Sequence, residues 1–118
     1  MSVIKVYCYS KCGTCRKAIK WLAENDISFE EKAIRETPPK PAELKLALKT
    51  GGSLRKLLNT SSQDYRELGL KDKLDSLSEL EVFGLLQENG NLVKRPFVVA
   101  HGKAWAGFNP DKWAELLA

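Results

Sequence analysis

The sequence has little of what metal centres and membrane segments require. Its 118 residues include a single histidine and three cysteines, and its apolar runs are short. A structural zinc site takes four ligands, commonly from two cysteine pairs, so no metal site is predicted from one pair and the distant His101. No run is long enough for a membrane helix, and the N-terminus does not resemble a signal peptide. We therefore expect a cytoplasmic protein without membrane contacts.

Signals for nucleotides and nucleic acids are also missing. No Gly-x-Gly-x-x-Gly motif is present, so we expect no nicotinamide and no other bound cofactor. The net charge is a modest +4, and Lys and Arg alternate with Asp and Glu along the chain. This pattern is typical of a solvated surface, so no direct nucleic-acid partner is predicted. The length and the 43% hydrophobic fraction fit one soluble globular domain, which we expect to be a monomer.

Hydrophobic periodicity predicts a β-α-β unit at the start of the chain. Residues 3–9 are rich in β-branched and aromatic side chains, which indicates a strand, and residues 27–34 indicate a second one. A helix is predicted between them over 14–25. Its apolar face consists of Cys15, Ala18, Ile19 and Leu22.

A run of helices is predicted next, over residues 41–50, 53–59, 60–69 and 76–90. Ser78 with Glu81 three residues later forms a capping box, and Ser61 or Ser62 caps the preceding helix. The predicted ends of three of these helices are glycines, which often follow a last helical turn: Gly51-Gly52, Gly69 and Gly90.

The chain closes with a predicted hairpin and a helix. Strands over 95–100 and 104–108 flank a turn, and Asn109 caps a helix over 109–118 that begins with Pro110. The order β-α-β, helices, β-β-α predicts an α/β, thioredoxin-like fold with a four-stranded mixed sheet. We expect a single domain over 1–118, with its core in 1–36 and 91–118 and a helical insertion over 37–90.

The motif Cys12-Gly13-Thr14-Cys15 stands where the first strand turns into the first helix. A helix N-terminus favours a thiolate, and Lys11 adds positive charge, so Cys12 is predicted to be the nucleophile. Gly13 leaves room for a substrate sulfur. Cys15, one turn later, can resolve a mixed disulfide on Cys12. Two small residues that simply pack together are the alternative interpretation of the motif.

Two further features accompany the motif. Cys8, in the first strand, is predicted to be a buried, inert thiol, with a second resolving thiol as the alternative. Pro96 opens the third strand and is a candidate for a cis peptide bond beside the Cys-x-x-Cys. Arg95 would then stabilise the Cys12 thiolate or bind an anionic substrate, unless it is only a solvated residue at a strand start.

Three segments in this order resemble the ArsC/Spx superfamily: YSKCGTCRKAIKWL, NTSSQDYRELGL, and LVKRPFVV followed by GFNPDKW. The resemblance covers essentially the whole chain. It implies a thioredoxin-like fold with a helical insertion, a nucleophile at Cys12, and an Arg95–Pro96 pair with a cis proline. We also predict substrate contacts for Lys11, Gly13, Thr14 and Pro96, which lie in or beside the motif or in the proline turn. The CGTC motif is most similar to uncharacterised relatives named as reductases.

The chain departs from the arsenate reductases of this superfamily. They hold arsenate with three arginines, and only Arg95 matches one of them. Asn59 stands at the position of the second, and the position of the third falls in the segment GFNP, which has no arginine. They carry a histidine where Cys8 stands and a serine where Cys15 stands. Native arsenate reduction is therefore disfavoured, and the prediction is a thiol-dependent reductase or thiol–disulfide oxidoreductase.

The alternative is a redox-sensitive transcriptional regulator of the Spx type. Such regulators use a Cys-x-x-Cys switch and bind the C-terminal domain of the RNA polymerase α subunit. Their binding surface includes a glycine in the helical insertion, roughly where Gly51-Gly52 stands in this sequence. For an enzyme, the implied partner is an external thiol donor, either glutathione with glutaredoxin or thioredoxin, or another redox protein. A third interpretation is a binding module on the same scaffold.

Overall fold

The centre of the molecule is a four-stranded mixed sheet with the strand order β2-β1-β3-β4. The computed structural model describes residues 4–9, 11–50, 54–60 and 62–117. The strands are β1 (Lys5–Cys8), β2 (Glu30–Ala33), β3 (Phe97–Ala100) and β4 (Lys103–Ala106). β1 is parallel to β2 because helix α1 (Gly13–Glu24) connects them, and β3 is antiparallel to both β1 and β4. The predicted four-stranded mixed sheet is confirmed.

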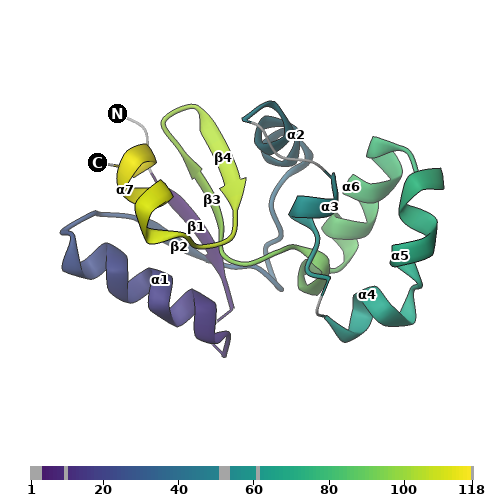
Figure 1. Ribbon diagram of the computed structural model, residues 1–118, viewed down its shortest axis with the longest axis horizontal. Helices are drawn as coiled ribbons and strands as arrows, with labels where there is room; N and C mark the ends of the chain where they lie inside the picture. The colour runs from purple at the N-terminus through teal and green to yellow at the C-terminus, as the bar shows by residue number, and fades with distance from the viewer. Residues whose placement is uncertain (1–3, 10, 51–53, 61, 118) are drawn as a thin grey trace.

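Each face of the sheet is covered by different helices (Figure 1). α1 and α7 (Pro110–Leu117) cover one face, where Val6 and Cys8 join Trp113 in an apolar cluster. Because successive side chains of a strand point to opposite faces, Tyr7 lies on the other face with Phe97. The alternation along β1 therefore directs Cys8, but not Tyr7, toward α1.

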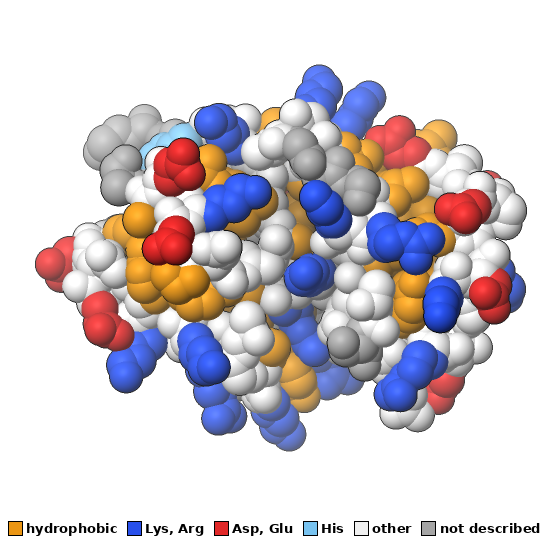
Figure 2. Space-filling model, viewed as in Figure 1, with side chains coloured by type: hydrophobic (Ala, Val, Ile, Leu, Met, Phe, Trp, Pro, Cys, Tyr) orange, Lys and Arg blue, Asp and Glu red, His pale blue; other side chains and the backbone are white. Residues whose placement is uncertain are grey.

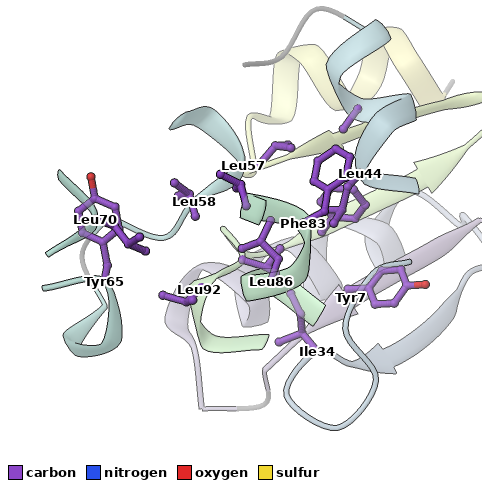
Figure 3. Close-up of a cluster of buried hydrophobic side chains, with 14 of the residues drawn as sticks. Tyr7, Ile34, Leu44, Leu57, Leu58, Tyr65, Leu70, Phe83, Leu86 and Leu92 are labelled. Atoms are coloured by element: carbon purple, nitrogen blue, oxygen red, sulfur yellow. The ribbon is translucent and has the colours of Figure 1, made fainter. Parts of the chain in front are cut away.

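The helical segment between β2 and β3 packs on the second face. It comprises α2 (Pro41–Lys49), α3 (Leu54–Leu57), α4 (Gln63–Glu67), α5 (Leu70–Lys73), η1 (Leu74–Ser76), α6 (Glu79–Glu88) and η2 (Gly90–Leu92). α2 packs along β4, while α4 and α5 lie at the end of the molecule away from α1 (Figure 1). Leu44, Leu57 and Leu86 share one apolar cluster with Tyr7 and Ile34 (Figure 3), so the segment is anchored to the sheet.

The predicted helix starts are confirmed by their caps. The Ser62 hydroxyl and the Asn109 side chain each accept a backbone N–H of the following turn, at 3.1 Å in both cases. Ser78 and Glu81 form the predicted capping box, with both hydrogen bonds at 3.2 Å. The predicted helix end at Gly51-Gly52 and the alternative cap at Ser61 lie outside the described residues.

Two elements differ from the sequence-based expectation. The second strand is shorter than 27–34 and begins only at Glu30, because it is an edge strand with mostly exposed side chains, where Glu30 pairs with Lys32 at 2.7 Å. Gly69 ends α4 in a left-handed conformation (φ 62°), but the chain continues directly into α5, which was not predicted. Within the described residues, no helix has both the length and the apolar character to cross a membrane.

Candidate functional site

The two cysteines of the CGTC motif occupy the first turn of α1 with different exposure. Cys12 is the N-cap residue and is partly exposed, and its N–H donates to the carbonyl of Tyr9 at 2.9 Å. Cys15 is in the same turn but only 2% exposed. Both are free thiols. Cys12 is therefore the more accessible of the two sulfurs for an incoming substrate, whereas Cys15 is buried.

Several hydrogen-bond donors converge on the buried sulfur of Cys15. The Cys8 thiol donates to it, the Tyr9 N–H lies 3.5 Å away, and the Cys12 thiol is a further donor. These bonds, with the Cys8 bond first, lower the pKa of Cys15 below that of an ordinary thiol despite its burial, and the charge of Arg95 adds to the effect. The donors around the resolving cysteine therefore favour its thiolate form.

Tyr9 connects this site to two arginines. The guanidinium of Arg95 lies over the Tyr9 ring, 5.1 Å from its centroid, and that of Arg35 lies at 5.2 Å. Arg35 also donates to the Tyr9 hydroxyl at 3.2 Å. The Arg95–Pro96 peptide bond is cis, and the Pro96 carbonyl accepts the Gly107 N–H at 2.8 Å. Since Arg95 lies over Tyr9 and lines the same groove as Cys12, the turn before β3 lies beside the start of α1.

A groove of about 510 Å³ opens at Cys12. Among its lining residues are the predicted Thr14 and Arg95, the cations Lys94 and Lys112, and Asn59 from the helical segment. Figure 2, which shows the face seen in Figure 1, has Lys and Arg side chains near the middle of the molecule. The groove therefore offers positive charge and polar donors next to the accessible sulfur.

Some of the predicted site residues line the groove at Cys12, and others do not. Cys12, Thr14 and Arg95 line the groove, whereas the described residues Lys11, Gly13 and Pro96 are not part of its lining. Lys11 and Gly13 are exposed beside the motif, and a side-chain carbon added at Gly13 would meet nothing within 4 Å. Gly13 therefore leaves open space at the helix start, and its predicted contact with a substrate sulfur stays a prediction.

Sequence reasoning missed four residues of this site: Tyr9, Arg35, Lys94 and Lys112. Tyr9 could have been found from its place between the first strand and the motif, since any residue there must lie next to the helix start. Arg35 and Lys112 come from distant segments, and no local pattern marks them. Among the described residues, no group of three or more metal-ligating side chains is positioned to hold a metal ion.

The chain is similar to known proteins over most of its length. The family model described as ArsC family matches residues 7–116. The uncharacterized protein YusI of Bacillus subtilis (strain 168) is 48% identical over 113 residues, covering 95% of this chain and 96% of that protein. The global transcriptional regulator Spx of Listeria innocua is 32% identical over 98% of this chain and 87% of its own length.

A solved structure extends the likeness to the fold. The crystal structure of a "possible arsenate reductase" from Streptococcus mutans UA159 superimposes with a TM-score of 0.85 at 39% sequence identity. The match covers 92% of this chain and 93% of that one. The similarity therefore includes both the sheet and the helical segment.

Proposed function

Because the chain belongs to the ArsC family, with a thioredoxin-like fold, we propose that it is a thiol-dependent reductase that works through Cys12 and Cys15. The observation that carries the proposal is the unequal exposure of the two sulfurs. The accessible Cys12 lies in a groove, and the buried Cys15 has donors that favour its thiolate. This arrangement suits attack by one thiol and resolution by the other.

The proposed reaction has two exchange steps. The Cys12 thiol gives up its proton to solvent as its sulfur attacks one sulfur of an oxidised substrate, R–S–S–R′, which forms a Cys12–S–S–R bond and releases R′ as a thiolate. Cys15 then attacks the Cys12 sulfur, which forms the Cys12–Cys15 disulfide and releases R as a thiolate. The substrate gains two electrons and the protein loses them. An external thiol, from glutathione with glutaredoxin or from thioredoxin, returns them.

The groove favours an anionic substrate. Lys94, Arg95 and Lys112 place three cationic side chains along it, and no carboxylate belongs to its described lining. Arsenate itself is a poor fit, because Asn59 and the segment 107–110 stand where arsenate reductases carry two of their arginines. A doubly charged oxyanion needs several fixed donors, and Arg95 alone supplies one bidentate partner. We propose an anionic disulfide as the substrate class.

The test is a single-turnover reaction of the reduced protein with glutathione disulfide, followed by intact mass. The wild type is expected to become oxidised without an adduct. Cys12→Ser is expected not to react, and Cys15→Ser is expected to retain one glutathione on Cys12 because the resolving sulfur is missing. Equal reaction of the two variants would contradict the assignment of attacking and resolving sulfurs.

A second candidate, a redox-controlled regulator, is supported by the likeness to Spx over nearly the whole chain. In this proposal a Cys12–Cys15 disulfide changes the surface at the start of α1, and the partner is the C-terminal domain of the RNA polymerase α subunit. The protein would act as a cytoplasmic monomer in either role. A binding titration with that domain, on reduced and oxidised protein, tests the candidate. Affinity that is absent or unchanged by oxidation would exclude the switch.

A further inference from the structure

A third thiol, Cys8, adjoins the redox pair and has no role in the mechanism above. It is the last residue of β1 and is 3% exposed. Its side chain and that of Cys15 both belong to the apolar cluster between the sheet and α1, and a hydrogen bond from its thiol is the first cause of the lowered pKa of Cys15. Cys15 therefore has two sulfur neighbours, Cys12 from its own helical turn and Cys8 from the adjacent strand.

Cys8 and Cys15 also share a hollow of their own. A pocket of about 330 Å³ is lined by both cysteines and by Tyr9, Arg16, Ile19, Lys20 and Glu31. Of the described residues that line this pocket, none lines the groove at Cys12. The two inner sulfurs thus adjoin a space separate from the one that a substrate enters.

From this juxtaposition we infer that Cys8 is a second resolving thiol, which moves the disulfide inward from Cys12–Cys15 to Cys8–Cys15. The inference rests on the proposed function, since it starts from the disulfide formed there. Its consequence is that Cys12 becomes a free thiol again while the protein keeps one intramolecular disulfide, now between Cys8 and Cys15.

The step is an isomerisation, so it needs no further oxidant or reductant. The Cys8 sulfur attacks the Cys15 sulfur, a Cys8–Cys15 bond forms, and the Cys12–Cys15 bond breaks. Cys12 leaves with the electron pair of that bond, and the proton of the Cys8 thiol passes to solvent or to Cys12. One disulfide and one thiol are present before and after the step.

The environment of Cys8 sets the order of events. In the reduced protein its pKa is raised well above that of a free thiol, first by the hydrogen bond to Cys15, then by burial and by the charges of Cys15, Glu31 and Cys12. Once Cys15 is bonded to Cys12, its thiolate is gone and the largest of these causes disappears. Burial and Glu31 still disfavour the Cys8 thiolate, so the isomerisation is slower than formation of the first disulfide.

Trypsin cleavage offers a direct test, because Cys12 and Cys15 share one peptide, 12–16, while Cys8 lies in another, 6–11. Reduced protein is oxidised with one equivalent of diamide, sampled over time, quenched with N-ethylmaleimide in denaturant, digested and analysed by mass spectrometry. The early product is expected to be an internal disulfide in peptide 12–16 with Cys8 alkylated. It is expected to give way to a cross-link of 6–11 with 12–16 that carries the alkyl group on Cys12.

The controls separate this inference from the proposed function. Cys8→Ala is expected to form only the internal Cys12–Cys15 disulfide, and Cys15→Ala is expected to lose both products. If the wild type keeps Cys8 alkylated in every oxidised molecule, or if the cross-link joins Cys8 to Cys12, the inference is wrong while the proposed function stands. If no Cys12–Cys15 disulfide forms in either the wild type or Cys8→Ala, both are wrong.

Discussion

The close approach of Gly90 to the backbone of Ile34 gives a sharp prediction about how the helical segment is joined to the sheet. A side-chain carbon built at Gly90 would lie 2.0 Å from the Ile34 carbonyl oxygen and 2.8 Å from the Arg35 Cα. These obstacles are backbone atoms, so no rotamer change relieves them. Overpacking usually lowers the free energy of unfolding by ~1–3 kcal/mol, and a clash with backbone atoms is expected at or above the upper end of this range. Gly90→Ala is therefore expected to lower the free energy of unfolding by about 3 kcal/mol or more.

Gly84 provides the matched control for this substitution. It is an exposed residue within α6, and an added carbon there would meet nothing within 4 Å. Gly84→Ala should therefore raise the free energy of unfolding by ~0.5–1 kcal/mol, because alanine restricts the unfolded chain and favours the helix. Urea denaturation followed by circular dichroism measures both variants. A Gly90→Ala protein within ~0.5 kcal/mol of wild type would refute the reasoning, since surface changes alone produce differences of that size.

Three further predictions concern the core and the thiols. Trp113→Ala removes a side chain that is 1% exposed and contacts two other tryptophans, so it should cost ~3–5 kcal/mol in urea denaturation, and a loss below ~1 kcal/mol would contradict the packing. Tyr7→Phe removes the hydroxyl that donates to Glu43 at 2.6 Å and should cost ~1–3 kcal/mol, whereas an unchanged midpoint would show that this bond contributes nothing. Cys8→Ala removes the main cause of the low pKa of Cys15, so the ultraviolet absorbance of the thiolate should appear at higher pH than in the wild type. An unchanged titration would refute the hydrogen bond between Cys8 and Cys15.

Much of the fold follows from local signals in the sequence. Ser62, Ser78 and Asn109 each satisfy N–H groups of the turn that follows, and this chemistry requires only neighbours in the chain. Two of the three strand pairings also follow, because a β-α-β unit fixes one parallel pair and a hairpin fixes one antiparallel pair. The β1–β3 pairing that joins them was not predicted. The short edge strand and α5 were mispredicted because neither has a periodic apolar face of useful length.

The site was less accessible to sequence reasoning than the fold. The motif itself indicates which thiols can react, but two of the donors around Cys15, Cys8 and Tyr9, come from the end of β1, and only the folded sheet places them there. The sequence favoured the thiolate of Cys12 through the helix terminus, whereas in the structure the hydrogen-bond donors gather on Cys15. Arg35 is a comparable case, because its contact with Tyr9 depends on where the chain leaves β2.

The most direct test of the central claim is a redox titration of the purified protein, with free thiols counted by alkylation and intact mass at each potential. The account predicts a reversible loss of two of the three thiols in a single step in the wild type, and no such step in Cys15→Ala, because Cys15 is the sulfur shared by both intramolecular disulfides proposed above. Three thiols that remain alkylatable at all potentials, or a two-thiol step that survives in Cys15→Ala, would contradict the account and leave the CGTC motif as part of the packing alone.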